Sequence, residues 1–195
     1  MSQRAEKTAD KILEAAIELI CEHGYQAVTT KSIAQAAGVS EMTVFRIFGT
    51  KKGILEAAID KYSYSVPMTH AFEECIKWNL EADLFMVSKL YHDLMRKNRK
   101  VFVISMMERN TMPELFTQST AHPRKLKELL TDYFAEMQRR GLVVAGDPEH
   151  QSITFLYMNH GKYVSETFTG GLVSSIQLDD WLPDAIRVLA RGLTP

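Results

Sequence analysis

Three lysines stand where a helix does not ordinarily place a positive charge. Lys31 falls in the first turn of one expected helix, and Lys51 and Lys52 open another. A cation at a helix N-terminus opposes the helix dipole, at a cost of about 0.3–1 kcal/mol. An anion at the same place is bound by the free backbone N–H groups. Lysines beside such groups therefore suit a contact with the phosphate backbone of a nucleic acid.

The segment between these lysines has the signals of two short helices joined by a tight turn. Thr29 or Thr30 can cap the first helix, and Gly38 can end it in a left-handed conformation. Ser40 can cap the second helix, with Glu41 in its first turn. Neither cap has Glu or Gln three residues later, so both capping boxes are expected to be incomplete. The pattern predicts a helix-turn-helix.

The second short helix, residues 41–48, has two different faces. Helical spacing gathers Val44, Ile47 and Phe48 on one side, which we expect to be buried. Met42 and Arg46 point the opposite way. The flanks carry Thr43 and Phe45. An exposed face of this kind on a short helix could enter the major groove of DNA.

Arg46 and Lys51 suit different parts of a DNA duplex. The guanidinium fork of Arg46 could bind guanine O6 and N7 together, a contact worth about 1–3 kcal/mol of discrimination between bases. Lys51 is a point charge and suits a phosphate, which carries no sequence information. Alternatively, Arg46 also binds phosphate. Sequence specificity would then come from contacts of Thr43, Met42 and Phe45 with thymine methyl groups.

A longer pattern surrounds this motif. Its residues are Ile12-Leu13-Glu14-Ala15-Ala16, Gly24-Tyr25, Thr29-Thr30, Ile33-Ala34, Ala37-Gly38-Val39-Ser40, Thr43, Phe45, Phe48, Lys51-Lys52 and Ile54-Leu55. The segment from Ala9 to about Ala58 thereby resembles the DNA-binding domain of the tetracycline-repressor (TetR) family of transcriptional regulators. The resemblance and the residue types together give the candidate DNA-contacting residues Thr30, Lys31, Ser40, Met42, Thr43, Phe45, Arg46 and Lys51.

Composition is consistent with an intracellular DNA-binding protein of ordinary size. The 195 residues are 46% hydrophobic and carry a net charge of −1, so the chain is not basic overall. Residues 29–52, however, hold four basic residues against one acidic residue, a local charge of +3. The two cysteines have no disulfide or zinc spacing. With no leader or membrane-spanning run visible, a cytoplasmic location is expected.

The rest of the chain keeps a helical pattern, which predicts an all-α fold. Residues 1–66 are expected to form the DNA-binding domain, with a linker helix from Lys51 to about Tyr64 that Pro67 ends. Residues 67–195 are expected to form a larger helical effector-binding and dimerisation domain. Further helices are expected at about residues 8–22, 69–78, 82–96, 101–108, 123–140, 148–169 and 180–191. The apolar run 101–108 could instead be a buried strand, but its helical neighbours favour a helix.

The second domain offers surfaces for a partner and for a small molecule. Apolar residues surround most of helix 148–169, so one of its faces can pack on its own core and another on a second subunit. We expect helices 123–140 and 148–169 to form most of that dimer interface. The Met and aromatic residues of the second domain either fill its hydrophobic core or line an adaptable apolar pocket. Members of the family that the chain resembles usually have such a pocket. Candidate wall residues for an apolar or aromatic effector are Phe72, Trp78, Phe102, Met106, Phe116, Tyr133 and Tyr157.

These observations favour a homodimeric, one-component transcriptional regulator, a repressor whose two reading helices enter successive major grooves of a palindromic operator roughly 34–36 Å apart. The helix at 51–64 would be the lever by which an effector changes that spacing. No metal, cofactor or catalytic triad is expected, so the chain is not expected to be an enzyme. One alternative is an architectural DNA-binding protein without an effector, which a closed second domain would favour. The other is a ligand-binding protein that has lost DNA binding, and the intact candidate contacts oppose it.

Overall fold

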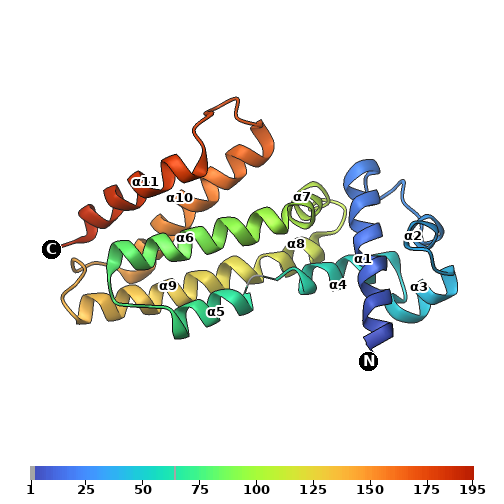
Figure 1. Ribbon diagram of the computed structural model, residues 1–195, viewed down its shortest axis with the longest axis horizontal. Coiled ribbons are helices and arrows are strands. Elements are labelled where there is room, and N and C mark those ends of the chain that lie inside the picture. Colours follow the sequence, from blue (N-terminus) through green and yellow to red (C-terminus); the bar gives the residue numbers. More distant parts are fainter. Residues whose placement is uncertain (1–2, 64) are drawn as a thin grey trace. The chain divides into compact units, whose positions relative to one another are not determined.

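The computed structural model describes residues 3–63 and 65–195 and is entirely helical over them (Figure 1). The predicted all-α class is confirmed, and the apolar run 101–108 lies in a helix. The helices are α1 (Gln3–His23), α2 (Thr30–Ala37), α3 (Glu41–Phe48), α4 (Lys51–Lys61), α5 (Ser65–Glu74), α6 (Leu80–Lys97), α7 (Arg99–Met107), α8 (Pro113–Ser119), α9 (Ala121–Arg139), α10 (Pro148–Thr169) and α11 (Leu178–Leu193).

The helices form two compact units, and neither is one continuous stretch of chain. The first unit takes residues up to 63 together with residues 98–121, so α7 and α8 join α1–α4. The second takes the described residues from 65 to 97 together with residues 122–195. The expected division after residue 66 remains a prediction about function. The compact N-terminal unit also contains residues 98–121, which the sequence pattern does not assign to it.

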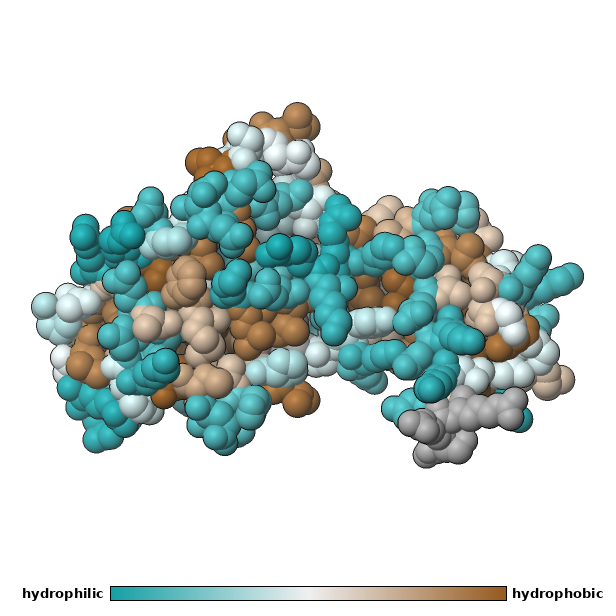
Figure 2. All heavy atoms as spheres, in the orientation of Figure 1, coloured by the Kyte–Doolittle hydropathy of each residue, from teal (hydrophilic) through white to brown (hydrophobic). Residues whose placement is uncertain are grey.

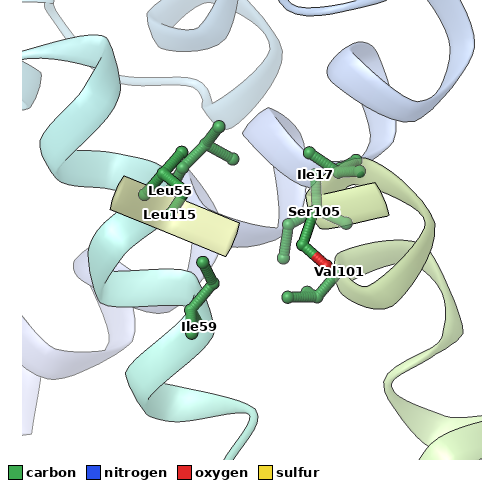
Figure 3. Close-up of a pocket in the computed structure, with 7 residues that line it drawn as sticks. Ile17, Leu55, Ile59, Val101, Ser105 and Leu115 are labelled. Carbon is green, nitrogen blue, oxygen red and sulfur yellow. The ribbon is translucent and has the colours of Figure 1, made fainter. Parts of the chain in front are cut away.

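The core of the first unit is built from both of its chain segments. Apolar side chains of α1, α2, α3 and α4 share one buried cluster with those of α7 and α8, in which α1 packs against α7 and α4 against α8. The buried side chains of this core include Ile12, Ala16, Ile33, Val44, Ile54, Ala58, Ile104 and Leu115. Between α1, α4, α7 and α8 remains a cavity of about 10 Å³, lined by Ile17, Leu55, Ile59, Val101, Ile104, Ser105 and Leu115 (Figure 3). This is at the lower limit for one water molecule, so the four helices are closely packed.

Pro67 has a different role from the one expected. The preceding helix, α4, ends at Lys61, and the expected end at Tyr64 lies outside the described residues. Pro67 instead stands in the first turn of α5. A proline is tolerated there because the first N–H groups of a helix have no intrahelical partner. The helix expected at 69–78 therefore begins earlier and ends at Glu74, and Trp78 adopts a left-handed conformation with φ of 59°.

The second unit packs α6 against α10 and α11. Two hydroxyl groups tie α6 to α10: Tyr163 donates to the Met95 carbonyl oxygen at 3.0 Å, and the Tyr91 hydroxyl lies 2.9 Å from Nδ1 of His160. The expected bounds of helix 148–169 are confirmed. Asp147 caps its first turn, and Gly170 ends it in the left-handed conformation.

Buried polar groups also lie on α6 and α10. Ser88, His92 and Asn159 are all buried, and Ser88 Oγ, His92 Nε2 and Asn159 Oδ1 lack a hydrogen-bond partner within the described structure. Burial lowers the pKa of His92 to about 4, although the nearby Glu166 charge opposes the shift. His92 is therefore neutral in the folded protein at neutral pH.

This burial predicts a pH-dependent stability. An unfolded histidine binds a proton near pH 6.5 and folded His92 only near pH 4, so the unfolded state binds more protons between these values. The contribution of neutral His92 is fully present above pH 6.5 and is lost as the pH falls toward 4, in total about 3 kcal/mol. Urea unfolding at several pH values should give a smaller acid loss for His92→Gln than for the wild type. His70→Gln, at an exposed site on α5, is the matched control; equal acid losses in both variants and the wild type would contradict the assignment.

Candidate nucleic-acid interface

The start of α2 is held by a complete capping box. The Thr29 hydroxyl oxygen accepts the Ser32 backbone N–H at 3.0 Å, and the Ser32 hydroxyl oxygen accepts the Thr29 N–H at 3.0 Å. The expectation of an incomplete box is wrong for this helix, because the shorter serine takes the place of Glu or Gln. Two backbone N–H groups at the N-terminus of α2, those of Thr29 and Ser32, are thereby satisfied.

The turn and the second cap form as the sequence predicts. Gly38 has φ of 68°, the left-handed conformation that glycine adopts without a Cβ penalty. Ser40 then accepts the backbone N–H of Thr43 at 3.2 Å, and the hydroxyl oxygens of these two residues are 2.9 Å apart. Across the turn, the Thr30 hydroxyl donates to the Glu41 carboxylate at 2.6 Å. This last bond ties the first residue of α2 to the first residue of α3.

The two faces of α3 are also as predicted. Val44 is buried, and Ile47 and Phe48 are half-buried against the core of the first unit. On the opposite side Arg46 is exposed, Met42 is 75% exposed and Phe45 is 49% exposed. Large apolar side chains gain by leaving water, so this face is suited to contact with another surface.

Lys51 lies in a different environment from the one expected. Its ammonium donates to the carbonyl oxygens of Tyr25 at 2.6 Å and of Val28 at 2.5 Å, and lies 3.9 Å from the centre of the Tyr25 ring. Partial burial lowers the pKa of Lys51, and the nearby Glu108 charge opposes the shift. A phosphate contact stays a prediction, but here the ammonium holds the turn between α1 and α2. Tyr25 and Glu108 were not among the candidate site residues, since only packing across the chain brings them to Lys51.

The other two lysines are closer to solvent. Lys31 is exposed in the first turn of α2. Lys52 lies at the start of α4, 3.8 Å from Glu56 and 3.7 Å from Glu114 in surface ion pairs. Such pairs are weak and screened by salt, so Lys52 could turn from them toward an approaching anion, and the exposed Lys31 is accessible to the same anion.

The candidate effector residues are divided between the units. In the second unit Trp78 stacks on Tyr133 with 5.9 Å between ring centres, and Phe72 meets Tyr133 edge-on at 6.2 Å. The Tyr133 hydroxyl donates to the buried carboxylate of Asp83 at 3.1 Å. Phe102, Met106 and Phe116 belong to the first unit, on α7 and α8, and Tyr157 is exposed on α10. Within the units the structure thus brings together three of the seven, as a packed aromatic cluster.

The described residues contain no group of three or more His, Cys, Asp or Glu side chains that could hold a metal ion. Nor, over the same residues, is any helix long and apolar enough to span a membrane. The site that these residues do form is a capped helix-turn-helix with an exposed second helix.

This geometry defines a helix-turn-helix DNA-binding protein. Residues 12–58 match the family model of bacterial regulatory proteins of the tetR family. Over 187 residues, covering 96% of this chain and 97% of the relative, the chain is 27% identical to an uncharacterised helix-turn-helix transcriptional regulator, YvkB, of Bacillus subtilis (strain 168). The helix-turn-helix segment of this chain is thus of the tetR family of bacterial regulatory proteins, and the whole chain is similar to a transcriptional regulator.

Solved structures share the fold over almost the whole chain. NalD of Pseudomonas aeruginosa, the secondary repressor of the MexAB-OprM multidrug efflux pump, superposes with a TM-score of 0.79 at 22% identity, covering 99% of this chain and 98% of NalD. PfmR, a TetR-family regulator of Thermus thermophilus, gives a TM-score of 0.73 at 20% identity, covering 94% of this chain and 99% of PfmR. At these identities the likeness concerns the fold alone.

The contacts of the lysines predict different losses. Lys51→Ala leaves the carbonyl oxygens of Tyr25 and Val28 without their donor, so the free energy of unfolding should fall by about 1–3 kcal/mol. Lys31→Ala should leave stability unchanged and reduce the salt dependence of DNA binding by about one unit, as expected for one lost phosphate contact. Denaturant unfolding and DNA binding at several salt concentrations measure both. If Lys51→Ala leaves stability unchanged and reduces the salt dependence of DNA binding, Lys51 contacts phosphate and does not hold the turn.

Proposed function

We propose that this TetR-family regulator is a ligand-responsive repressor that binds a palindromic operator as a homodimer in the cytoplasm. The observation that carries the proposal is the exposed face of α3, where Met42, Phe45 and Arg46 are presented by a helix capped at its first turn. A rigid short helix with apolar and basic side chains on its outer face can read base edges in the major groove. The exposed Lys31 would meet the flanking phosphates.

The surface of the second unit supports a dimer. Tyr157 and Phe168 on α10 and Val188 on α11 are exposed, while the apolar stripe of α9 is buried in its own unit. Further apolar side chains lie in the loop between α10 and α11, at the top of Figure 2, where Leu172, Val173 and Ile176 are exposed. These positions support an interface made by α10 with α11, rather than by α10 with the helix at 123–140.

The interior of the second unit supports a neutral effector. The aromatic cluster of Phe72, Trp78 and Tyr133 offers apolar contact. The buried Ser88, His92 and Asn159 offer uncharged hydrogen-bonding atoms that lack partners in the described structure. A multiply charged anion would be poorly paired in such surroundings. By linkage, the effector can release DNA only as far as it binds the DNA-free state more tightly.

Selection of bound duplexes from a random DNA pool tests the proposal. We expect a palindromic consensus with two half-sites centred about 34–36 Å apart, one helical turn of DNA. Enrichment of an asymmetric sequence, or no enrichment over random DNA, would overturn it. Repeating the selection with candidate neutral aromatic compounds should identify an effector by loss of the enriched sequence.

The operator allows the role of Arg46 to be separated from that of a phosphate contact. Arg46→Ala should relax the base preference at one position of each half-site, by about 1–3 kcal/mol of discrimination. Binding to all single-base variants of the selected operator, at several salt concentrations, measures this. If Arg46→Ala weakens all variants equally and keeps the base preferences, Arg46 binds phosphate and the apolar side chains of α3 carry specificity.

The dimer face predicts a contrast between two valines. Val188 on α11 is 74% exposed and Val66 on α5 is 77% exposed, so glutamate at either site should leave the folded subunit intact. Only Val188→Glu would place two like charges in the proposed interface, where a buried unpaired charge is costly. Sedimentation at micromolar concentration should give monomers for Val188→Glu and dimers for Val66→Glu and the wild type. A monomeric wild type, or a dimeric Val188→Glu, would count against the interface.

A further inference from the structure

Glu108 lies far outside the segment that the family model matches, yet it contacts the helix-turn-helix. It follows the last residue of α7, and its carboxylate oxygen Oε1 accepts the backbone N–H of Tyr25 at 3.3 Å. Its other oxygen accepts a hydrogen bond from the Thr111 hydroxyl, which fixes the side chain from the opposite end. A contact of this kind, across 83 positions of sequence, joins α7 to the turn between α1 and α2.

Tyr25 is therefore held on both sides of its own backbone. Glu108 accepts from its N–H, and the Lys51 ammonium donates to its carbonyl oxygen at 2.6 Å. The negative charge of Glu108 opposes the lowering of the Lys51 pKa and contributes to the raised pKa of Tyr25, so the three groups lie within one electrostatic neighbourhood. The same ammonium also binds the carbonyl oxygen of Val28, one residue before the Thr29 cap of α2.

Residues 98–121 are well placed to hold Glu108 in position. Gln118 donates to the Asp60 carboxylate at 2.7 Å and to the Glu56 carbonyl oxygen at 3.2 Å. Asn98 donates to the Tyr62 carbonyl oxygen at 2.7 Å. Both ends of the segment are thus bonded to α4 or to Tyr62, the residue that follows it, in addition to the apolar packing of α7 and α8. These contacts hold residues 98–121, and with them the backbone of Glu108, in a defined position.

We propose that Glu108 is a positioning residue for DNA recognition, which sets the entry of α2 by holding Tyr25 against Lys51. The consequence extends to the reading helix, because the Thr30 hydroxyl binds Glu41 and so ties the start of α2 to the start of α3. Glu108 touches no base or phosphate in this role. The proposal rests on the proposed function, in which α3 reads DNA. Glu108 would affect how well α3 fits the operator, and not the electrostatic attraction between protein and DNA.

Removal of the carboxylate separates this role from electrostatics. Glu108→Ala should weaken binding of the full-length protein to the selected operator by about tenfold, as loss of one hydrogen bond of about 1.4 kcal/mol would. Binding to a scrambled duplex of equal length should not weaken, since loss of an acidic residue favours contact with phosphates. Glu108→Gln keeps an acceptor for the Tyr25 N–H and should retain operator binding within about threefold.

Glu114 provides the matched control. It lies on α8 in the same segment, is exposed, and is paired only loosely with Lys52 at 3.7 Å. Glu114→Ala removes the same charge without touching Tyr25, so operator binding should stay the same or tighten slightly. If Glu108→Ala and Glu114→Ala change operator binding alike, or if Glu108→Ala weakens both duplexes equally, the positioning role is wrong.

Amide hydrogen exchange measures the contact without DNA. The Tyr25 amide should exchange faster in Glu108→Ala than in the wild type or Glu108→Gln, while the α1 amides keep their protection. This readout also separates the two proposals: if no operator is selected, the proposed function fails, and the Tyr25 exchange still decides whether Glu108 holds the turn. Unchanged Tyr25 exchange in Glu108→Ala would overturn the inference.

Discussion

The apolar core shared by two chain segments is the constraint on which the DNA-reading geometry depends. A helix-turn-helix of about sixty residues buries only a modest fraction of its surface and is marginally stable alone. Here Ile104, Met112 and Leu115 of the later segment are buried in the same core as α1 and α4. That packing enlarges the core and leaves the outer side of α3 free of internal contacts. The reading face can therefore be exposed without weakening its support.

Polar contacts on the surface of this core fix the positions of α2 and α3. The ammonium of Lys51 is bound by two carbonyl oxygens rather than left beside the N-terminus of α4, which relieves part of the conflict between its charge and the helix dipole. The Thr29–Ser32 box fixes where α2 begins. Each contact is worth only about 0.5–3 kcal/mol, but together they remove the freedom that a loop and two short helices would otherwise have.

Sequence reasoning succeeded where the physics is local. A cap at Thr29 or Thr30, the cap at Ser40, the left-handed Gly38 and the two faces of α3 follow from side chains a few residues apart, and so does the all-helical class. Sequence reasoning missed one local contact, the Ser32 half of the Thr29 capping box, because serine takes the place of Glu or Gln there. It failed where partners are distant. Nothing in the pattern near Lys51 reveals the carbonyl oxygens of Tyr25 and Val28, and nothing near Glu108 reveals Tyr25. The membership of residues 98–121 in the first unit depends on packing between segments, which periodicity along one segment does not encode.

Native-state hydrogen exchange tests the central claim, that residues 98–121 and residues 3–63 form one cooperative unit. Amides of α7 and α8 should open with the same free energy as those of α1 and α4, because they share a core, and this free energy should differ from that of α6, α9 and α10. A destabilising substitution in the shared core, Leu115→Ala, should lower the opening free energy of α1 and α4 as much as that of α8. If the α7 and α8 amides instead open together with those of α6 and α9, and Leu115→Ala leaves α1 protected, the account is contradicted.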